Sequence, residues 1–209
     1  MMEYVPEVTD KEIEEVHRHF EERITLYRDM GMDFEKHRNF LLEKTSPLED
    51  DMLEIGTGTG YTAVSLAKDG YNFTSIDTDE DALKTTAARL AYEKVLLNVK
   101  FYIMDATCMG FGDDSFKSIF AINLLHHVAG IEELLSEADR VLCSRGKIII
   151  SDFNEEGREV IEAVHKAEGG SHDHSIPGVE QVCSFFEKKG YSISIFNDMG
   201  HWTMIAQKG

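Results

Sequence analysis

Hydrophobic and polar residues follow each other along the chain in a pattern typical of an α/β protein. Between residues 52 and 153, short apolar runs recur, and most are followed by a turn and a segment with helical spacing. The sequence predicts strands at 52–55, 72–77, 99–104, about 116–122 and 147–153, and helices at 61–68, 80–94 and 131–142. A parallel sheet with helices on both faces is therefore expected.

The segments outside this pattern predict helices at the start and a closing pair of strands at the end. Two amphipathic helices are expected at 10–30 and 33–44, and Pro47 separates them from the following strands. Further elements are expected as a helix at 155–168, a polar loop at 169–175, a helix from Pro177 to Lys189, and strands at 191–197 and 202–207. We interpret residues 1–47 as a helical lid and 48–209 as one domain with an insertion at 155–175, together forming one compact unit.

A glycine-rich turn follows the first predicted strand. Gly56, Gly58 and Gly60 alternate with threonines, so a ligand can approach the bare backbone and meet N–H groups at the helix start. The nicotinamide-binding pattern G-x-G-x-x-G would require glycine at the next position, where this chain has Tyr61. The turn therefore indicates a nucleoside-type ligand of another kind.

Acidic residues end the next two strands. Asp77 comes 21 residues after Gly56, at a position where a carboxylate can accept hydrogen bonds from both ribose hydroxyls. Asp105 follows the third strand and can accept from an exocyclic amine such as that of adenine. The alternative is that both residues form turns or cap helices, as aspartates commonly do.

These segments resemble the motifs of a known family. L-E-I-G-T-G-T-G (53–60), I-D (76–77) and M-D-A (104–106) are similar to motif I and its two successors in the class I S-adenosylmethionine-dependent methyltransferases. The segments 116–128 and 141–152 resemble the fourth and fifth strands of the small-molecule branch, in the style of ubiquinone and menaquinone biosynthesis enzymes. The resemblance implies a Rossmann-like sheet of seven strands, mostly parallel with an antiparallel last strand, that binds S-adenosyl-L-methionine and releases S-adenosyl-L-homocysteine.

The resemblance also implies which residues hold each part of the cofactor. Glu54 and the glycine loop would hold the methionine end, Asp77 the ribose, and Asp105 the adenine. The complete set of implied cofactor-binding residues is Glu54, Gly56, Thr57, Gly58, Gly60, Asp77, Thr78, Asp105, Ala106 and Asn123.

Histidines supply the candidates for acid–base chemistry. His126 and His127 follow the fourth strand, where a neutral imidazole can take a proton from an O–H or N–H nucleophile, although one of them can instead cap or support the next helix. We name both as candidate catalytic residues. The remaining helical histidines lie among charged residues and are expected to face solvent: these are His17, His19, His37 and His165.

The acceptor pocket is expected between the N-terminal helices and the insertion, because chain added outside the core pattern can build acceptor specificity. Tyr27, His172 and His174 are the candidate substrate-binding residues. His172-Asp173-His174 has the residue types of a metal site, but ordinary turn chemistry explains the same residues, and no metal is expected. Alternatively, both segments cover apolar surface or form a dimer contact.

Composition limits the function further. The net charge of −18 argues against a nucleic-acid substrate, because binding phosphates requires clustered lysine and arginine. No apolar segment is long enough to span a membrane, and no signal peptide is visible, so a cytoplasmic location is expected. We expect the protein to be a monomer or homodimer. The leading hypothesis is methyl transfer to an unidentified small-molecule acceptor. The alternatives are an aminopropyltransferase-like enzyme and a non-catalytic S-adenosylmethionine-binding partner or regulatory protein.

Overall fold

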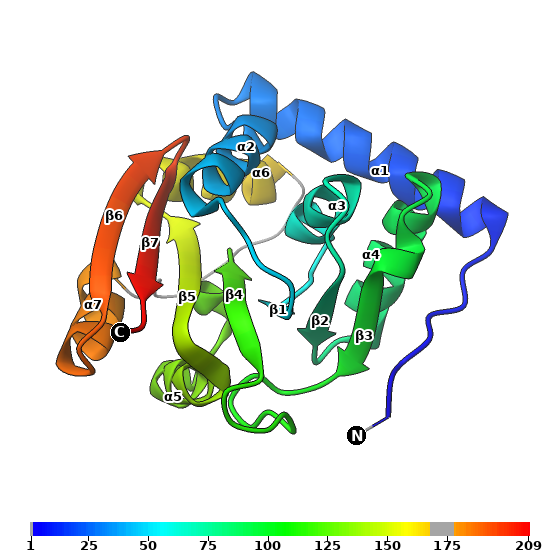
Figure 1. Cartoon of the computed structure of the whole chain (residues 1–209). Coiled ribbons are helices and arrows are strands. Elements are labelled where there is room, and N and C mark those ends of the chain that lie inside the picture. The colour runs from blue at the N-terminus through cyan, green and yellow to red at the C-terminus, as the bar shows by residue number, and fades with distance from the viewer. Residues whose placement is uncertain (1, 168–177) are drawn as a thin grey trace.

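A computed structural model describes residues 2–167 and 178–209 of the chain. Within them lies a seven-stranded sheet in the order β3-β2-β1-β4-β5-β7-β6 (Figure 1). The strands are β1 (Met52–Ile55), β2 (Phe73–Asp77), β3 (Val99–Ile103), β4 (Phe116–Ile122), β5 (Leu142–Phe153), β6 (Ser192–Asp198) and β7 (His201–Gln207). Strands β1 to β5 are parallel, and β7 runs antiparallel to both of its neighbours. The predicted fold class is confirmed.

The helices agree with the sequence prediction to within a few residues. They are α1 (Asp10–Asp29), α2 (Phe34–Thr45), α3 (Tyr61–Lys68), α4 (Glu80–Tyr92), α5 (Ile131–Val141), α6 (Glu155–Ala167) and α7 (Val179–Lys188), with short 3-10 turns η1 (Leu96–Asn98) and η2 (Leu125–His127). Helix α1 starts where expected because Thr9 and Glu12 form a capping box. Pro177 and the predicted loop at 169–175 lie outside the described residues.

Strand β5 begins earlier than the sequence predicts, at Leu142 rather than at 147. Leu142 pairs with Phe116, and the register shifts before Ser118 pairs with Lys147. Arg145 has φ +62°, in the left-handed region, within this irregular segment. The early part of the strand lacks the apolar run that predicted the remainder, and for this reason the sequence pattern missed it.

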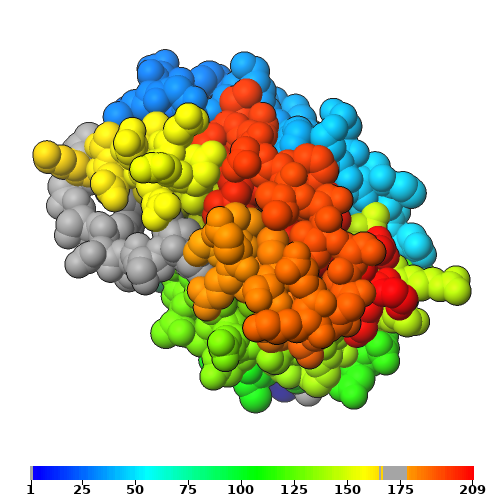
Figure 2. Space-filling view, turned by 90° about the vertical axis from the view of Figure 1, so that its left-hand side faces the viewer, coloured from blue at the N-terminus to red at the C-terminus, as the bar shows by residue number. Residues whose placement is uncertain are grey.

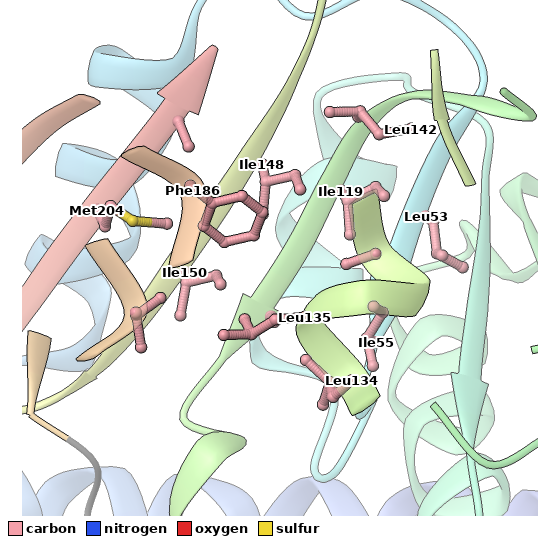
Figure 3. Packing of buried hydrophobic residues seen from close by; sticks show 14 of the residues in the cluster. Leu53, Ile55, Ile119, Leu134, Leu135, Leu142, Ile148, Ile150, Phe186 and Met204 are labelled. Atoms are coloured by element: carbon pink, nitrogen blue, oxygen red, sulfur yellow. The ribbon is translucent and has the colours of Figure 1, made fainter. Parts of the chain in front are cut away.

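The sheet buries a hydrophobic layer on each face because its strand residues point alternately to the two sides. On one face, Ile148 and Ile150 pack with Leu134 of α5 and Phe186 of α7 (Figure 3). On the opposite face, Ile149 belongs to a cluster with residues of α2, α3 and α4. Helices therefore cover both faces, and the carboxyl ends of the parallel strands meet at one edge.

A third, smaller cluster joins the N-terminal helices to the segment after β5. Tyr27 of α1 and Phe34 of α2 are buried in it with Phe153 and with Val164 of α6. Helix α1 also packs along α4. Figure 2 shows α6, in yellow, below the blue N-terminal helices and beside the red and orange β6–β7 hairpin. The N-terminal helices are thus packed onto the core at two separate places.

Candidate functional site

A cavity of about 700 Å³ lies at the carboxyl ends of the parallel strands. The loop after β1, the ends of β2 to β5, and residues of α1, α2, α4 and α6 line it. Its volume falls within the range of small-molecule sites. Helix α1 lies across this edge of the molecule (Figure 1) and contributes five lining residues: Val16, His19, Phe20, Arg23 and Tyr27.

Two of the three glycines in the loop after β1, Gly58 and Gly60, are required for different structural reasons. All three have positive φ values. A Cβ atom at Gly58 would meet no atom within 4 Å, so this glycine lies open to the cavity that it lines. A Cβ atom at Gly60 would lie 2.8 Å from Oγ1 of Thr86 on α4. Gly60 does not line the cavity, and its role in the structure is the close packing of the loop against α4.

Glu54 lies at the base of the cavity with its carboxylate buried. Ser75 Oγ and Thr57 Oγ1 donate to Glu54 Oε2 at 2.5 and 3.1 Å, and the backbone N–H of Ala63 also donates to the carboxylate. Burial raises the pKa of Glu54 to about 7 in spite of these bonds. Ala63 is in the first turn of α3, so a carboxylate of the protein already occupies the end of the helix where a dinucleotide would place its pyrophosphate.

The two strand-end aspartates combine local turn bonds with a position on the cavity. Asp77 accepts from the backbone N–H groups of Gly58 at 3.1 Å and Asp79 at 3.0 Å. Asp105 Oδ1 accepts from the backbone and side chain of Thr107, and these bonds hold the pKa of Asp105 below its usual value. Both aspartates line the cavity. The turn role anticipated as an alternative is therefore present together with the cavity position.

Asn123 directly follows β4 and adopts the left-handed conformation, with φ +53°. Its backbone N–H donates to the carbonyl of Ser151 at 2.7 Å, which ties the end of β4 to β5. Its Oδ1 atom is buried and has no hydrogen-bond partner among the described residues. A buried acceptor of this kind calls for a donor, and a ligand amine or hydroxyl in the cavity could supply one.

His126 forms a hydrogen-bonded pair with Asp152, the penultimate residue of β5. The His126 Nδ1 atom lies 2.8 Å from Asp152 Oδ1, and the His126 backbone N–H donates to Oδ2 at 3.3 Å. Asp152 is fully buried and also accepts from the N–H of Phe153. Because an ionised carboxylate only accepts, Nδ1 carries the proton and Nε2 of a neutral His126 is an acceptor. His127 also lines the cavity, and its ring centroid lies 4.0 Å from that of His126.

The sequence interpretation did not assign a role to two residues of this site. Asp152 belongs to the segment 141–152 that resembles the family's fifth strand, yet its pairing with His126 depends on the adjacency of β4 and β5. Arg89 lines the cavity from α4 and is buried, but in sequence it resembles any arginine of an amphipathic helix. The only available signal was the position of Asp152 at a strand end.

The predicted substrate-binding residues are only partly covered by the structure. Tyr27 lines the cavity, whereas His172 and His174 lie outside the described residues. Within the described ranges there is no group of three or more potential metal ligands.

The expectation that His37 faces solvent is wrong. The side chain is buried, its ring centroid lies 3.8 Å from that of His201, and its Nε2 atom is 3.1 Å from Ser151 Oγ. The β6–β7 hairpin covers this side of α2, which the charged neighbours in sequence did not indicate.

The strand order is that of a Rossmann-like fold, and the glycine-lined cavity with its strand-end carboxylates suits a nucleoside ligand. Residues 53–150 match the family described as methyltransferase domain. This match covers slightly less than half of the chain and agrees with the resemblance of these residues to the class I S-adenosylmethionine-dependent methyltransferases. None of the described helices has the length and hydropathy needed to cross a membrane.

Individual proteins support the same family. The uncharacterized methyltransferase YcgJ of Bacillus subtilis (strain 168) is 29% identical over 135 residues, covering 64% of this chain and 53% of that protein. The ubiquinone/menaquinone biosynthesis C-methyltransferase UbiE of Rickettsia massiliae (strain Mtu5) is 30% identical over 113 residues, covering 51% of this chain and 46% of that protein. The chain thus spans about half the length of these curated relatives.

A solved structure supports the fold. Phosphoethanolamine N-methyltransferase 2 of Haemonchus contortus, in complex with S-adenosyl-L-methionine, superimposes with a TM-score of 0.64 at 19% identity. The superposition covers 83% of this chain and 52% of that chain. At this identity the similarity shows the shared architecture.

Proposed function

We propose that this protein transfers a methyl group from S-adenosyl-L-methionine to a small-molecule acceptor. The observation that carries this proposal is the cavity in which Glu54, Asp77 and Asp105 converge with an open glycine loop. These carboxylates fit the ligand because its amine, ribose and adenine are hydrogen-bond donors. The orphaned Oδ1 of Asn123 fits a further donor at the methionine end.

In this proposal the protein mainly positions the two reactants. When bound, S-adenosyl-L-methionine supplies an electrophilic methyl group, so the protein contributes orientation, exclusion of water and proton transfer. Asp152 fixes the ring of His126 and directs its Nε2 lone pair away from the Nδ1 bond. His126 would accept the proton of an acceptor hydroxyl or amine, and His127 is the second candidate. The acceptor pocket would lie where Tyr27, Phe34 and Ile161 bring α1, α2 and α6 to the cavity.

The charges in the cavity disfavour aminopropyl transfer. That reaction would require carboxylates that grip a polyamine outside the nucleoside site. Among the described lining residues, the carboxylates are Glu54, Asp77, Asp79 and Asp105, all at the ends of β1 to β3 or just after them. The side of the cavity near α1 instead carries Arg23 and Arg89, which would repel a cationic acceptor.

Product analysis tests the proposal directly. The protein is titrated calorimetrically with S-adenosyl-L-methionine and then incubated with it and fractionated metabolite pools. The expected products are S-adenosyl-L-homocysteine and an acceptor heavier by one methyl group. Methylthioadenosine as the product would instead indicate aminopropyl transfer, and binding with no product in any pool would indicate a binding protein. Failure to bind the methyl donor would contradict the proposal as a whole.

An Asp152→Asn variant examines the proposed base. The asparagine amide carries no negative charge, so it holds the Nδ1–H group of His126 less strongly than the carboxylate does. Turnover should therefore fall by about 100-fold or more, while the affinity for the methyl donor stays within threefold. Equal losses in turnover and donor affinity would point to general disruption of the cavity.

We also expect the protein to act in the cytoplasm as a monomer or homodimer, with residues 1–47 serving as a lid.

A further inference from the structure

Arg89 is a buried cation whose guanidinium group reaches the cavity from α4. The residue is only 7% exposed, and its Nη1 donates to the carbonyl of Thr59 in the glycine loop. Its Cζ atom lies 3.2 Å from the ring centroid of Phe20 and 5.5 Å from that of Tyr61. Arginine has five N–H donors, so this single hydrogen bond leaves most of its donors available.

No carboxylate of the described chain forms an ion pair with Arg89, although Glu21 and Glu93 stabilise its charge at longer range. None of the ion pairs formed by the described residues, all of them within 4.0 Å, includes Arg89. Burial lowers the pKa of Arg89 to about 10, and the guanidinium therefore remains charged at neutral pH. A buried charge without a directly paired counter-ion is costly. The aromatic rings offset part of that cost, and an anionic ligand group would offset more.

The charges of the lining residues are separated by position. The four described carboxylates lie at the ends of β1, β2 and β3, or directly after them. The two arginines, Arg23 and Arg89, lie on α1 and α4. This basic side is unusual in a protein with a net charge of −18. Long-range electrostatics would repel an anion from such a protein, so a local arginine is needed to hold one.

We propose that Arg89 binds a carboxylate of a ligand in this cavity. The inference rests on the proposed function and extends it to a residue of α4 that the family motifs do not include. The carboxylate has two possible sources, the amino-acid end of the methyl donor and an anionic acceptor. The hydrogen bond to Thr59 places Arg89 beside the glycine loop, which is consistent with either source. Arginine suits this role because its planar donors match a carboxylate in a bidentate manner.

The test compares wild-type protein with an Arg89→Gln variant. S-adenosyl-L-homocysteine and methylthioadenosine share adenine, ribose and a thioether, but only the first carries a carboxylate. If Arg89 binds the carboxylate of the cofactor, the variant should bind S-adenosyl-L-homocysteine about 10- to 100-fold more weakly and methylthioadenosine within twofold of wild type. Calorimetry measures both affinities.

A second arm examines an acceptor carboxylate. Both proteins, saturated with S-adenosyl-L-homocysteine, are titrated with benzoate and with benzamide as a neutral control. Binding of benzoate that is lost in the variant, with unchanged S-adenosyl-L-homocysteine affinity, would assign the carboxylate to the acceptor. Unchanged behaviour in both arms, or equal weakening of S-adenosyl-L-homocysteine and methylthioadenosine, would overturn the proposal and leave Arg89 as a structural link between α1 and α4.

Two further variants keep these outcomes interpretable. Arg89→Lys retains the charge but loses the planar donors, so it should recover part of the lost affinity while remaining folded. Arg38→Gln removes a nearby cation that does not line the large cavity and should leave the affinities unchanged. If wild-type protein binds neither nucleoside, the proposed function fails; if it binds both with no effect of Arg89, only this inference fails.

Discussion

Glu54 offers a prediction that links the buried site to pH. Burial holds the pKa of Glu54 at about 7, above its ordinary value of 4.5. If this carboxylate contacts the ammonium group of the methyl donor, binding requires its ionised form. Below pH 7 the ligand must therefore bind a protein that first loses a proton. Affinity should rise with pH up to about 7 and remain constant above it.

The magnitude follows from the displacement of the pKa. At pH 5.5 the carboxyl lies about 1.5 pH units below its midpoint, so affinity should be about 30-fold weaker than at pH 8, or about 2 kcal/mol. A Glu54→Gln variant removes the titrating group. Its affinity should be about 10- to 100-fold weaker than wild type at pH 8 and nearly independent of pH. Ser75 and Thr57 can reorient their hydroxyls toward the new amide, which limits structural damage.

Calorimetry of S-adenosyl-L-homocysteine binding between pH 5.5 and 8 provides the assay. Repeating each titration in buffers of different ionisation enthalpy counts the protons released, and close to one per ligand is expected at pH 5.5. A flat affinity profile for wild-type protein, or the same slope in Glu54→Gln, would refute the reasoning. In either case Glu54 would serve to hold the loop after β1 rather than the ligand.

Other substitutions test separate parts of the structure. Gly60→Ala should lower the free energy of unfolding by about 2 kcal/mol, because the new Cβ atom would meet Thr86. Gly58→Ala should lower it by only about 1 kcal/mol, through backbone strain alone. The reverse order in urea unfolding would contradict this prediction. Burial lowers the pKa of His37 to about 4, so on acidification the unfolded chain takes up the proton before the folded protein does. The free energy of unfolding should therefore fall by about 3 kcal/mol from pH 6.5 to pH 4. An equal loss in a His37→Gln variant would show that His37 is not the cause. Asp77→Ala should weaken binding of the methyl donor by about 1–3 kcal/mol, and unchanged calorimetric affinity would remove Asp77 from the site.

The sequence predicted the features that depend on local pattern. Helix α3 was predicted to the residue, because a glycine turn marks its start and helical spacing its length. The sequence placed Asp77 and Asp105 at strand ends, and both line the cavity. A ligand-binding role for them stays a prediction. The seven strands and the antiparallel last strand also followed from the family resemblance, whereas strand–helix alternation alone does not fix which strands are neighbours.

Features that depend on tertiary contacts were not predictable in the same way. Asp152 and His126 are 26 residues apart and meet only because β4 and β5 are adjacent. Arg89 is buried because Phe20, from a helix 69 residues earlier, covers it. His37 appeared solvent-facing for the same reason, because the strands that cover it come at the end of the chain. In each case the missing information was which distant segment packs on a given side chain.

The position of α1 has a kinetic consequence. This helix forms one wall of the cavity and is also packed into the clusters that join it to α2, α4 and α6. A ligand exchanged along that wall has to disturb these contacts, so its release rate is coupled to the opening of a packed helix. Solvent viscosity, and substitutions at α1–α4 contacts that do not line the cavity, would then change residence times without altering any group that touches the ligand.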